Sequence, residues 1–213
     1  MRFAIAGEGL TDFAILKNLL IGFTNEKNLP VRRLLPELNE PFGWSNLFDQ
    51  LSKDRFRGSF ELNDYIIVQI DSGTCEDWKE GLKHIGDDES LVEGFVNQII
   101  QVLIKRIGEE FYTKNKQKII FAVAVHDIEC WVLPFISEKA SDQSKMVNCF
   151  RSAENIANKK GFSLNQKNYR EGKYYDDLSK GMTKQKDLLK LYKLNPSLRI
   201  FVDKLIQVFP DKP

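Results

Sequence analysis

The sequence predicts an α/β domain whose central, mainly parallel sheet is flanked by helices. Three short apolar runs, rich in isoleucine, valine and phenylalanine, lie at residues 2–6, 65–70 and 119–125. Such runs are typical of strands that are buried on both faces, as in a parallel sheet between two helical layers. Helical patterns separate the runs, and this alternation favours a Rossmann-like architecture whose ligands bind beyond the carboxyl ends of the strands.

The segments between the three strands predict two helices and two further elements. Apolar residues at helical spacing predict a helix over residues 12–22, with Thr11 as its N-cap, and a longer one over residues 89–107. Residues 29–38 contain two prolines and suggest an additional edge strand. Residues 45–52 suggest a short helix.

Composition and charge divide the chain into two regions. The 213 residues are 42% hydrophobic and 29% charged, which supports a real core and excludes a disordered chain. We expect an α/β core at residues 1–135 and a helical, lysine-rich extension at 136–213 packed on it, with helices near 145–158, 183–192 and 196–208. The formal net charge is only +1, but residues 139–193 carry 13 basic and 6 acidic side chains.

The cysteines and the apolar runs bear on the location of the protein. Cys75, Cys130 and Cys149 are odd in number and form no CxxC pair, which argues for a reducing compartment and against a disulfide scaffold. The first apolar run meets Gly7 and Glu8 too early for a signal peptide, and no run reaches about 18 residues. These features predict a cytoplasmic protein without a membrane segment.

Each of the three strands predicted at residues 2–6, 65–70 and 119–125 is followed by acidic residues. Glu8 follows the first strand, Asp71 the second, and Asp127 and Glu129 the third. In a parallel sheet these ends share one edge, so Glu8, Asp71 and one of Asp127 or Glu129 are expected to meet. At an effective dielectric constant of about 20, two like charges 4 Å apart repel by about 4 kcal/mol, so the cluster needs a cation or shared protons. Hard oxygen ligands at an accessible edge suit Mg²⁺ or Mn²⁺.

Three motifs carry a resemblance to a known family. They are AGEGLTD at residues 6–12, the strand end Ile70-Asp71-Ser72, and DIECWVL at residues 127–133. Together they resemble the Toprim superfamily, and most closely the small prokaryotic Toprim-like proteins of unknown function related to the RloB group. The resemblance covers roughly residues 2–135 and implies a Toprim-like α/β core.

The resemblance also implies roles for individual acids. The glutamate of the first motif is Glu8, which would serve as a metal ligand or as a general acid and base. Asp71 and Glu129 would be further metal ligands. The second aspartate of the family's Asp-x-Asp motif falls on Gly73 and is therefore missing. Two acids of the following loop are the candidates to replace it: Glu76 and Asp77.

The activity implied by the resemblance is Mg²⁺-dependent cleavage of DNA or RNA phosphodiesters. The related proteins accompany phage-defence and restriction loci, which implies a role in defence against mobile elements and an ATPase-like partner protein encoded nearby. Two other functions stay open: hydrolysis of a nucleotide or another phosphate ester, and a degenerate, non-catalytic module that binds a partner or a nucleotide.

The lysine-rich region supplies candidate contacts to nucleic acid. Cations neutralise phosphates and aromatic rings stack on unpaired bases, although lysine-rich helices are often only solvated faces. Two lysines, Lys180 and Lys184, are candidate catalytic residues that would stabilise transition-state charge. The candidate nucleic-acid-binding residues are Lys159, Lys160, Lys167, Arg170, Lys173 and Tyr174.

Several of these residues have simpler interpretations. Asp12 is expected to stabilise the start of its helix, and Glu129 also suits the positive end of a helix dipole, which contributes only about 0.3 to 1 kcal/mol. The Gly7–Gly9 turn alone is also typical of a phosphate cradle, but it contains a carboxylate. A zinc site formed by His126, Glu129 and Cys130 is disfavoured, because no second histidine stands at ligand spacing.

Overall fold

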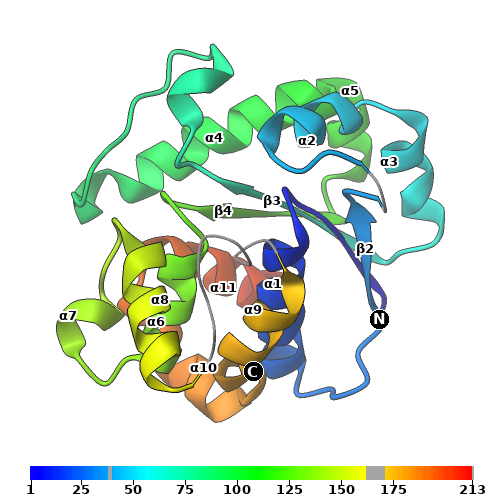
Figure 1. The fold of residues 1–213 in the computed structure, drawn as a ribbon. Coiled ribbons are helices and arrows are strands. Elements are labelled where there is room, and N and C mark those ends of the chain that lie inside the picture. Colours follow the sequence, from blue (N-terminus) through cyan, green and yellow to red (C-terminus); the bar gives the residue numbers. More distant parts are fainter. Residues whose placement is uncertain (38–39, 162–170, 213) are drawn as a thin grey trace.

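The computed structural model of the chain describes residues 1–37, 40–161 and 171–212. Its centre is a four-stranded sheet in the order β2-β1-β3-β4, in which every neighbouring pair of strands is parallel (Figure 1). This confirms the α/β, Rossmann-like fold class. The strands are β1 (Phe3–Ala6), β2 (Val31–Leu35), β3 (Tyr65–Asp71) and β4 (Ile119–Ala124).

Helices cover both faces of the sheet and bury two hydrophobic clusters against it (Figure 1). One layer contains α1 (Leu10–Thr24), α6 (Glu129–Ile136), α8 (Cys149–Lys159), α9 (Gly172–Leu178), α10 (Gln185–Leu191) and α11 (Pro196–Val208). The other contains α2 (Trp44–Gln50), α3 (Asp54–Gly58), α4 (Val92–Ile107) and α5 (Glu109–Asn115). A short helix, α7 (Ala140–Gln143), and the 3₁₀ helices η1 (Ser59–Glu61), η2 (Cys75–Trp78), η3 (Glu89–Leu91), η4 (Lys180–Thr183) and η5 (Tyr192–Leu194) complete the described elements.

The predicted strands and helices of the α/β region are confirmed, including β2 at one edge of the sheet. The predicted N-cap Thr11 is wrong. Helix α1 begins at Leu10 with Gly9 as its N-cap, because the Asp12 carboxylate accepts the Gly9 N–H at 2.6 Å and closes the first turn.

The helices of the extension share a core with the rest of the chain. Tyr175 of α9, Met182 of η4 and Leu188 of α10 are buried in the same cluster as residues of α1. Helix α11 crosses the sheet, and Phe209 at its end packs against the rings of Phe3 and Tyr65 at the starts of β1 and β3. A domain boundary at residue 135 stays a prediction, and hydrophobic packing is continuous across it.

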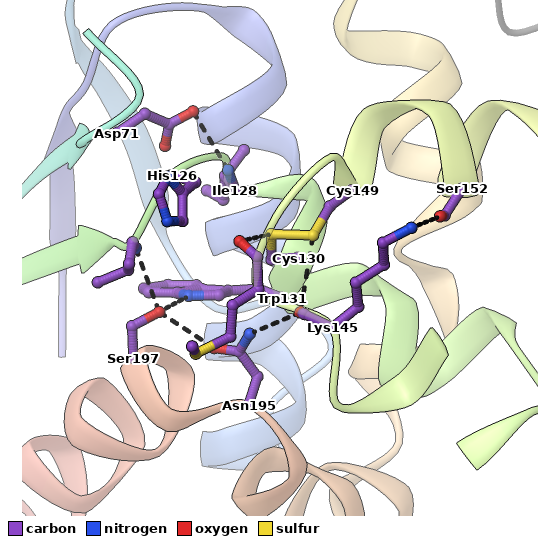
Figure 2. Close-up of a disulfide and its surroundings, with 12 residues drawn as sticks. Asp71, His126, Ile128, Cys130, Trp131, Lys145, Cys149, Ser152, Asn195 and Ser197 are labelled. Atoms are coloured by element: carbon purple, nitrogen blue, oxygen red, sulfur yellow. Dashed lines mark hydrogen bonds between the residues drawn. A yellow bond between two sulfur atoms is a disulfide. The ribbon is translucent and has the colours of Figure 1, made fainter. Parts of the chain in front are cut away.

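The cysteines differ from expectation. Cys130 at the start of α6 and Cys149 at the start of α8 form a disulfide with a Cα–Cα distance of 5.0 Å, and Cys75 is a buried thiol (Figure 2). The two helices pack together, which brings into contact residues that are 19 positions apart. This disulfide was not expected from the sequence, which argued against disulfide bonds. It removes the support for a reducing compartment, and it leaves Cys130 without a free thiolate for a zinc site.

In the described part of the chain, no helix combines the length and apolarity that a membrane crossing requires.

Candidate active site

The carboxyl ends of the strands open into a cavity of about 670 Å³ that is lined by five acidic residues. They come from three separate segments of the chain: the turn from β1 into α1, the end of β3, and the turn from β4 into α6. Among the described residues, no lysine or arginine lines this cavity. The five acids are Glu8, Asp12, Asp71, Asp127 and Glu129. Glu8, Asp71 and Glu129 therefore line the same cavity, as the sequence analysis expected.

Glu8 lies in the turn between β1 and α1 and is hydrogen-bonded to the end of β3. Its Oε1 accepts the backbone N–H of Asp71 at 2.8 Å. The pKa of Glu8 is raised to about 8. Burial is the largest cause, and the negative charge of Asp12 nearby is the second. Without a cation, Glu8 therefore holds its proton at neutral pH.

Asp71 ends β3 and is held on both carboxylate oxygens. Gln69 donates to Oδ1 at 2.8 Å. The backbone N–H of Ile128 donates to Oδ2 at 3.2 Å (Figure 2). Burial and then the negative charges of Asp12 and Glu8 raise the pKa of Asp71 well above its ordinary value. The Asp71 side chain is thus positioned by its own strand and by the segment that follows β4.

Gln69 links the carboxyl ends of β1 and β3. The sequence analysis did not predict it as a site residue. It is fully buried, its Nε2 donates to Asp71, and its Oε1 accepts the N–H of Glu8 at 3.4 Å. Gly7 leaves room for this amide, because a Cβ at position 7 would lie 2.9 Å from Gln69 Oε1. A signal was available: Gln69 is the one polar residue inside the apolar run 65–70, and a buried amide needs partners.

Glu129 begins α6 and is held by the extension. It is only 8% exposed, and the hydroxyl of Tyr175 in α9 donates to its Oε1 at 2.5 Å. Burial raises the pKa of Glu129 to about 7, against the opposing effect of the Tyr175 hydrogen bond. Burial and the charge of Glu129 also raise the pKa of Tyr175. Because Tyr175 lies 46 positions further along the chain, no local pattern predicts this contact.

Trp131 holds α6, the helix that carries Glu129, against the start of α11. This indole is fully buried and donates to the Ser197 hydroxyl at 2.8 Å, which also accepts the N–H of Val125 at 3.3 Å and donates to Asn195 Oδ1 at 3.0 Å (Figure 2). The start of α11 therefore joins α6 to the end of β4. The position of Glu129 is fixed through these contacts as well as through Tyr175.

We expect Tyr175→Phe to destabilise the protein by about 1 to 3 kcal/mol at pH 8, because a buried carboxylate then loses its hydroxyl donor. At pH 5 the loss should be smaller, since Glu129 is then protonated and less dependent on a donor. Urea denaturation at the two pH values measures the difference. The neighbouring Tyr174→Phe is the matched control, and equal losses at both pH values would contradict the assigned hydrogen bond.

Asp127 lies close to the position where the second aspartate of the family motif is missing. A Cβ built on Gly73 would be 3.1 Å from Asp127 Oδ1 and 3.1 Å from the carbonyl oxygen of His126. The carboxylate therefore occupies the space toward which a side chain at position 73 would point. Burial raises the pKa of Asp127, which is opposed by the two histidines nearby, His126 and His84.

Asp12 has two roles in the structure. It stabilises the start of α1 as expected, through the hydrogen bond from Gly9, and it also lines the cavity. Burial raises its pKa to about 6, although the hydrogen bond from Gly9 lowers it. The sequence interpretation favoured the first role over metal binding.

The structure does not bring the loop acids Glu76 and Asp77 to the cavity, where they were expected to replace the missing aspartate. Both are exposed on η2 and neither lines the cavity, and Glu76 accepts the backbone N–H of His84 at 3.2 Å. The physical reason is that η2 packs Cys75 and Trp78 inward, which turns the acids between them outward.

Lys180 and Lys184 are also not brought to the acidic cluster. Both side chains are exposed, and neither lines the cavity. The Lys184 Nζ atom lies 3.9 Å from Oδ2 of Asp187. Helix η4 packs against the far end of α1, where a Cβ on Gly22 would collide with the backbone of Met182. At 1.5 Å per residue, Gly22 lies about 20 Å along α1 from Gly9, so the two lysines are at the wrong end of that helix.

Of the predicted nucleic-acid-binding residues, Lys167 and Arg170 lie outside the described residues. The other four do not line the cavity. Lys159 and Lys160 are exposed at the end of α8, and the Lys160 ammonium donates to the Ile136 carbonyl at 2.7 Å. Lys173 pairs with Glu171 at 3.1 Å and lies over the ring of Tyr174. Helix α8 nevertheless starts at the cavity, because Phe150 in its first turn lines it.

The acids are close in space, but several of their oxygens already accept hydrogen bonds from the protein. Glu8, Asp71 and Glu129 bond to the protein as described above. Within residues 1–37, 40–161 and 171–212, no three His, Cys, Asp or Glu side chains are arranged to hold a metal ion as they stand. Carboxylate oxygens are the ligands that hard divalent cations prefer, so the donor set fits Mg²⁺ or Mn²⁺ provided that some side chains rotate.

Comparison with known proteins leaves the family open. The chain matches no protein-family model, no curated protein and no solved structure. The resemblance to the Toprim superfamily, the setting in phage defence and an ATPase-like partner therefore stay predictions from the sequence motifs.

Proposed function

We propose that the chain is a Toprim-like, Mg²⁺-dependent phosphodiesterase that acts on nucleic acid. The observation that carries the proposal is the convergence of five carboxyl groups in one cavity that no described lysine or arginine lines. Burying several carboxyl groups together without a cation costs stability, and it is found mainly where a metal ion or proton-transfer chemistry requires it. The raised pKa values of about 8, 7 and 6 at Glu8, Glu129 and Asp12 reflect this cost of burial.

The residues divide into a proton-transfer group and an oxygen-donor group. A divalent cation, when bound, would neutralise the phosphate and lower the pKa of the attacking water. Asp71, Asp127 and Glu129 are the donors proposed to hold it, with Asp127 taking the place of the aspartate missing at position 73. Glu8, next to Asp71 and with a pKa of about 8, suits the transfer of a proton at neutral pH.

The shape of the cavity favours a second candidate, hydrolysis of a nucleotide or another small phosphate ester. A volume of about 670 Å³ lies within the range of small-molecule sites, about 300 to 1,000 Å³. Its lining includes the apolar side chains Leu10, Phe42 and Phe150, and Phe42 is 42% exposed. Aromatic rings beside a phosphate site suit a base of either a mononucleotide or a single strand.

Salt dependence separates the two candidates. If the substrate is a polynucleotide, binding should weaken steeply with salt, because each neutralised phosphate releases counterions. We expect the triple reversal of Lys159, Lys160 and Arg170 to glutamate to weaken oligonucleotide binding about tenfold or more at low salt and to reduce the salt slope. Fluorescence anisotropy with a labelled oligonucleotide measures both quantities, and Mg²⁺ affinity should be unchanged.

The matched control reverses three exposed lysines outside the extension, Lys27, Lys53 and Lys105, and thus changes the net charge equally. If both triple variants bind equally, the extension is not the nucleic-acid surface. If wild-type binding is insensitive to salt while a mononucleotide phosphodiester is cleaved, the small-substrate candidate replaces the first.

A further inference from the structure

The acidic cavity also has an apolar wall. The side chains that form it together with the five acids are Leu10, Phe42, Ile128 and Phe150. Phe42 comes just before α2, and Phe150 lies in the first turn of α8. Helices α2 and α8 belong to the layers on opposite faces of the sheet (Figure 1). Aromatic rings therefore reach the cavity from both helical layers.

Phe42 is the more unusual of the two rings. It is 42% exposed, whereas every other phenylalanine, tyrosine and tryptophan among the described residues is buried or half-buried. No described aromatic ring packs against it, although the nearby Trp44 contacts the rings of Phe48 and Trp78. An aromatic ring left in water forgoes the stabilisation that burial gives, and beside a concave site it is available to a ligand.

The backbone holds Phe42 next to Glu8. The N–H of Gly43 donates to the Glu8 carbonyl oxygen at 2.9 Å. The backbone N–H of Trp44 lies close enough to the Glu8 carboxylate to lower its pKa, against the larger effect of burial. The Trp44 ring is anchored in turn by the ring of Phe48, at a centroid distance of 5.6 Å. These contacts fix residue 42 relative to the acid that is proposed to transfer the proton.

The charge of the cavity restricts what the apolar wall can bind. Five acids line it and no described lysine or arginine does, so a phosphate binds there only through a cation, and the rest of the substrate must bind through uncharged surface. A nucleobase is a flat, uncharged ring joined to a phosphate through a sugar, and bases stack on aromatic side chains. Within a duplex the neighbouring base pairs cover both faces of a base, so only an unpaired base can stack on Phe42.

We propose that Phe42 stacks on an unpaired nucleobase whose phosphate is bound at the acidic cluster. The inference rests on the proposed function for the position of the phosphate. It narrows the substrate from nucleic acid in general to a single strand or a free nucleotide. Both sources present the same chemistry, which is a phosphate with an uncovered base one sugar away.

Binding of thymidine monophosphate in the presence of Mg²⁺ tests the stacking. In isothermal titration calorimetry, Phe42→Ala should weaken binding about 5- to 150-fold, which corresponds to about 1 to 3 kcal/mol. Phe42→Tyr keeps the ring and should bind within about twofold of the wild type. Ribose phosphate lacks the base, so its affinity should be the same for all three proteins. Leu62→Ala is the matched control, because Leu62 is 57% exposed but lies outside the cavity.

Two results would overturn the proposal, whether or not the protein cleaves a phosphodiester. One is equal affinity of the wild type and Phe42→Ala for thymidine monophosphate. The other is a wild type that binds thymidine monophosphate no more tightly than ribose phosphate. Base-dependent binding without any Mg²⁺-dependent cleavage would instead remove the proposed function and support the base site, so the two failures are distinguishable.

Oligonucleotides identify the source of the base. A short oligothymidylate that binds at least about tenfold more tightly than the mononucleotide would support the proposal with a single strand as the source. Equal affinity for the two would support it with a free nucleotide as the source. Phe42→Ala should weaken both ligands by the same factor. Tighter binding of a hairpin duplex than of the oligothymidylate would overturn the proposal, because a duplex offers no uncovered base.

Discussion

Glu8→Gln is expected to lower Mg²⁺-dependent phosphodiester cleavage by about 10²- to 10⁴-fold, the usual contribution of a positioned acid or base. The fold should be kept, because the amide oxygen of glutamine can still accept the Asp71 N–H. The metal-free variant should even be more stable than the wild type at pH 8. Glutamine cannot ionise, so it avoids the cost of a buried charge that raises the pKa of Glu8.

Turnover of an oligonucleotide with Mg²⁺ or Mn²⁺ measures the first effect, and thermal unfolding measures the second. Glu76→Gln is the matched control, because Glu76 follows β3 in the same edge region but is exposed and outside the cavity. Asp71→Asn should also lose activity, and it should lose stability, because its amide nitrogen cannot accept and would face one of the two donors, Gln69 or Ile128. Retained turnover in both Glu8→Gln and Asp71→Asn would remove the catalytic assignment.

The metal-free protein is expected to lose stability as the pH rises from 5 to 8. The folded-state pKa values of Asp12, Glu129 and Glu8, about 6, 7 and 8, lie above their ordinary values of 3.8, 4.5 and 4.5. A raised carboxyl pKa means that the folded state binds more protons than the unfolded state in this range. The stability is fully present below about pH 4 and is lost as the pH rises through the folded values, by about 1.4 kcal/mol per pH unit for each group.

Mg²⁺ should reverse this loss, because a bound cation favours the ionised carboxylates that burial penalises. We expect the melting temperature with EDTA to fall between pH 5 and pH 8, and Mg²⁺ to raise it more at pH 8 than at pH 5. Glu8→Gln should flatten the first dependence. A metal-free melting temperature that rises between pH 5 and pH 8 would contradict the raised pKa values.

The strand ends show how much of the site the sequence predicted. The three strands were recognisable because buried parallel strands read as continuous apolar runs, and their shared direction placed Glu8, Asp71 and Glu129 at one edge. That inference needs only strand order and direction. The inference does not depend on side-chain contacts, which the sequence alone does not give.

The contacts that hold the acids depend on long-range packing and were missed. Tyr175 meets Glu129 only because α9 packs on α1, and Asp127 fills the space beside Gly73 only because β3 and β4 are neighbours. The disulfide between Cys130 and Cys149 likewise follows from the packing of α6 on α8.

The rejected candidates were chosen by charge and by nearness in sequence. Glu76 and Asp77 follow Asp71 closely, but a single 3₁₀ turn directs them to solvent. Lys180 and Lys184 belong to a basic region, but their segment docks at the far end of α1. For Glu76 and Asp77 a local signal was present, because the flanking Cys75 and Trp78 pack inward and turn the two acids outward.

A crystal soaked in Mn²⁺ and measured at the manganese absorption edge tests the central claim most directly. The account predicts an anomalous peak in the cavity at the carboxyl ends of the strands, at coordination distance from at least two of the carboxylates of Asp71, Asp127, Glu129 and Glu8. It also predicts that the Glu8 or Glu129 side chain has rotated away from its present partner. A fully soaked crystal with no peak among these four residues, or with manganese bound only elsewhere, would contradict it.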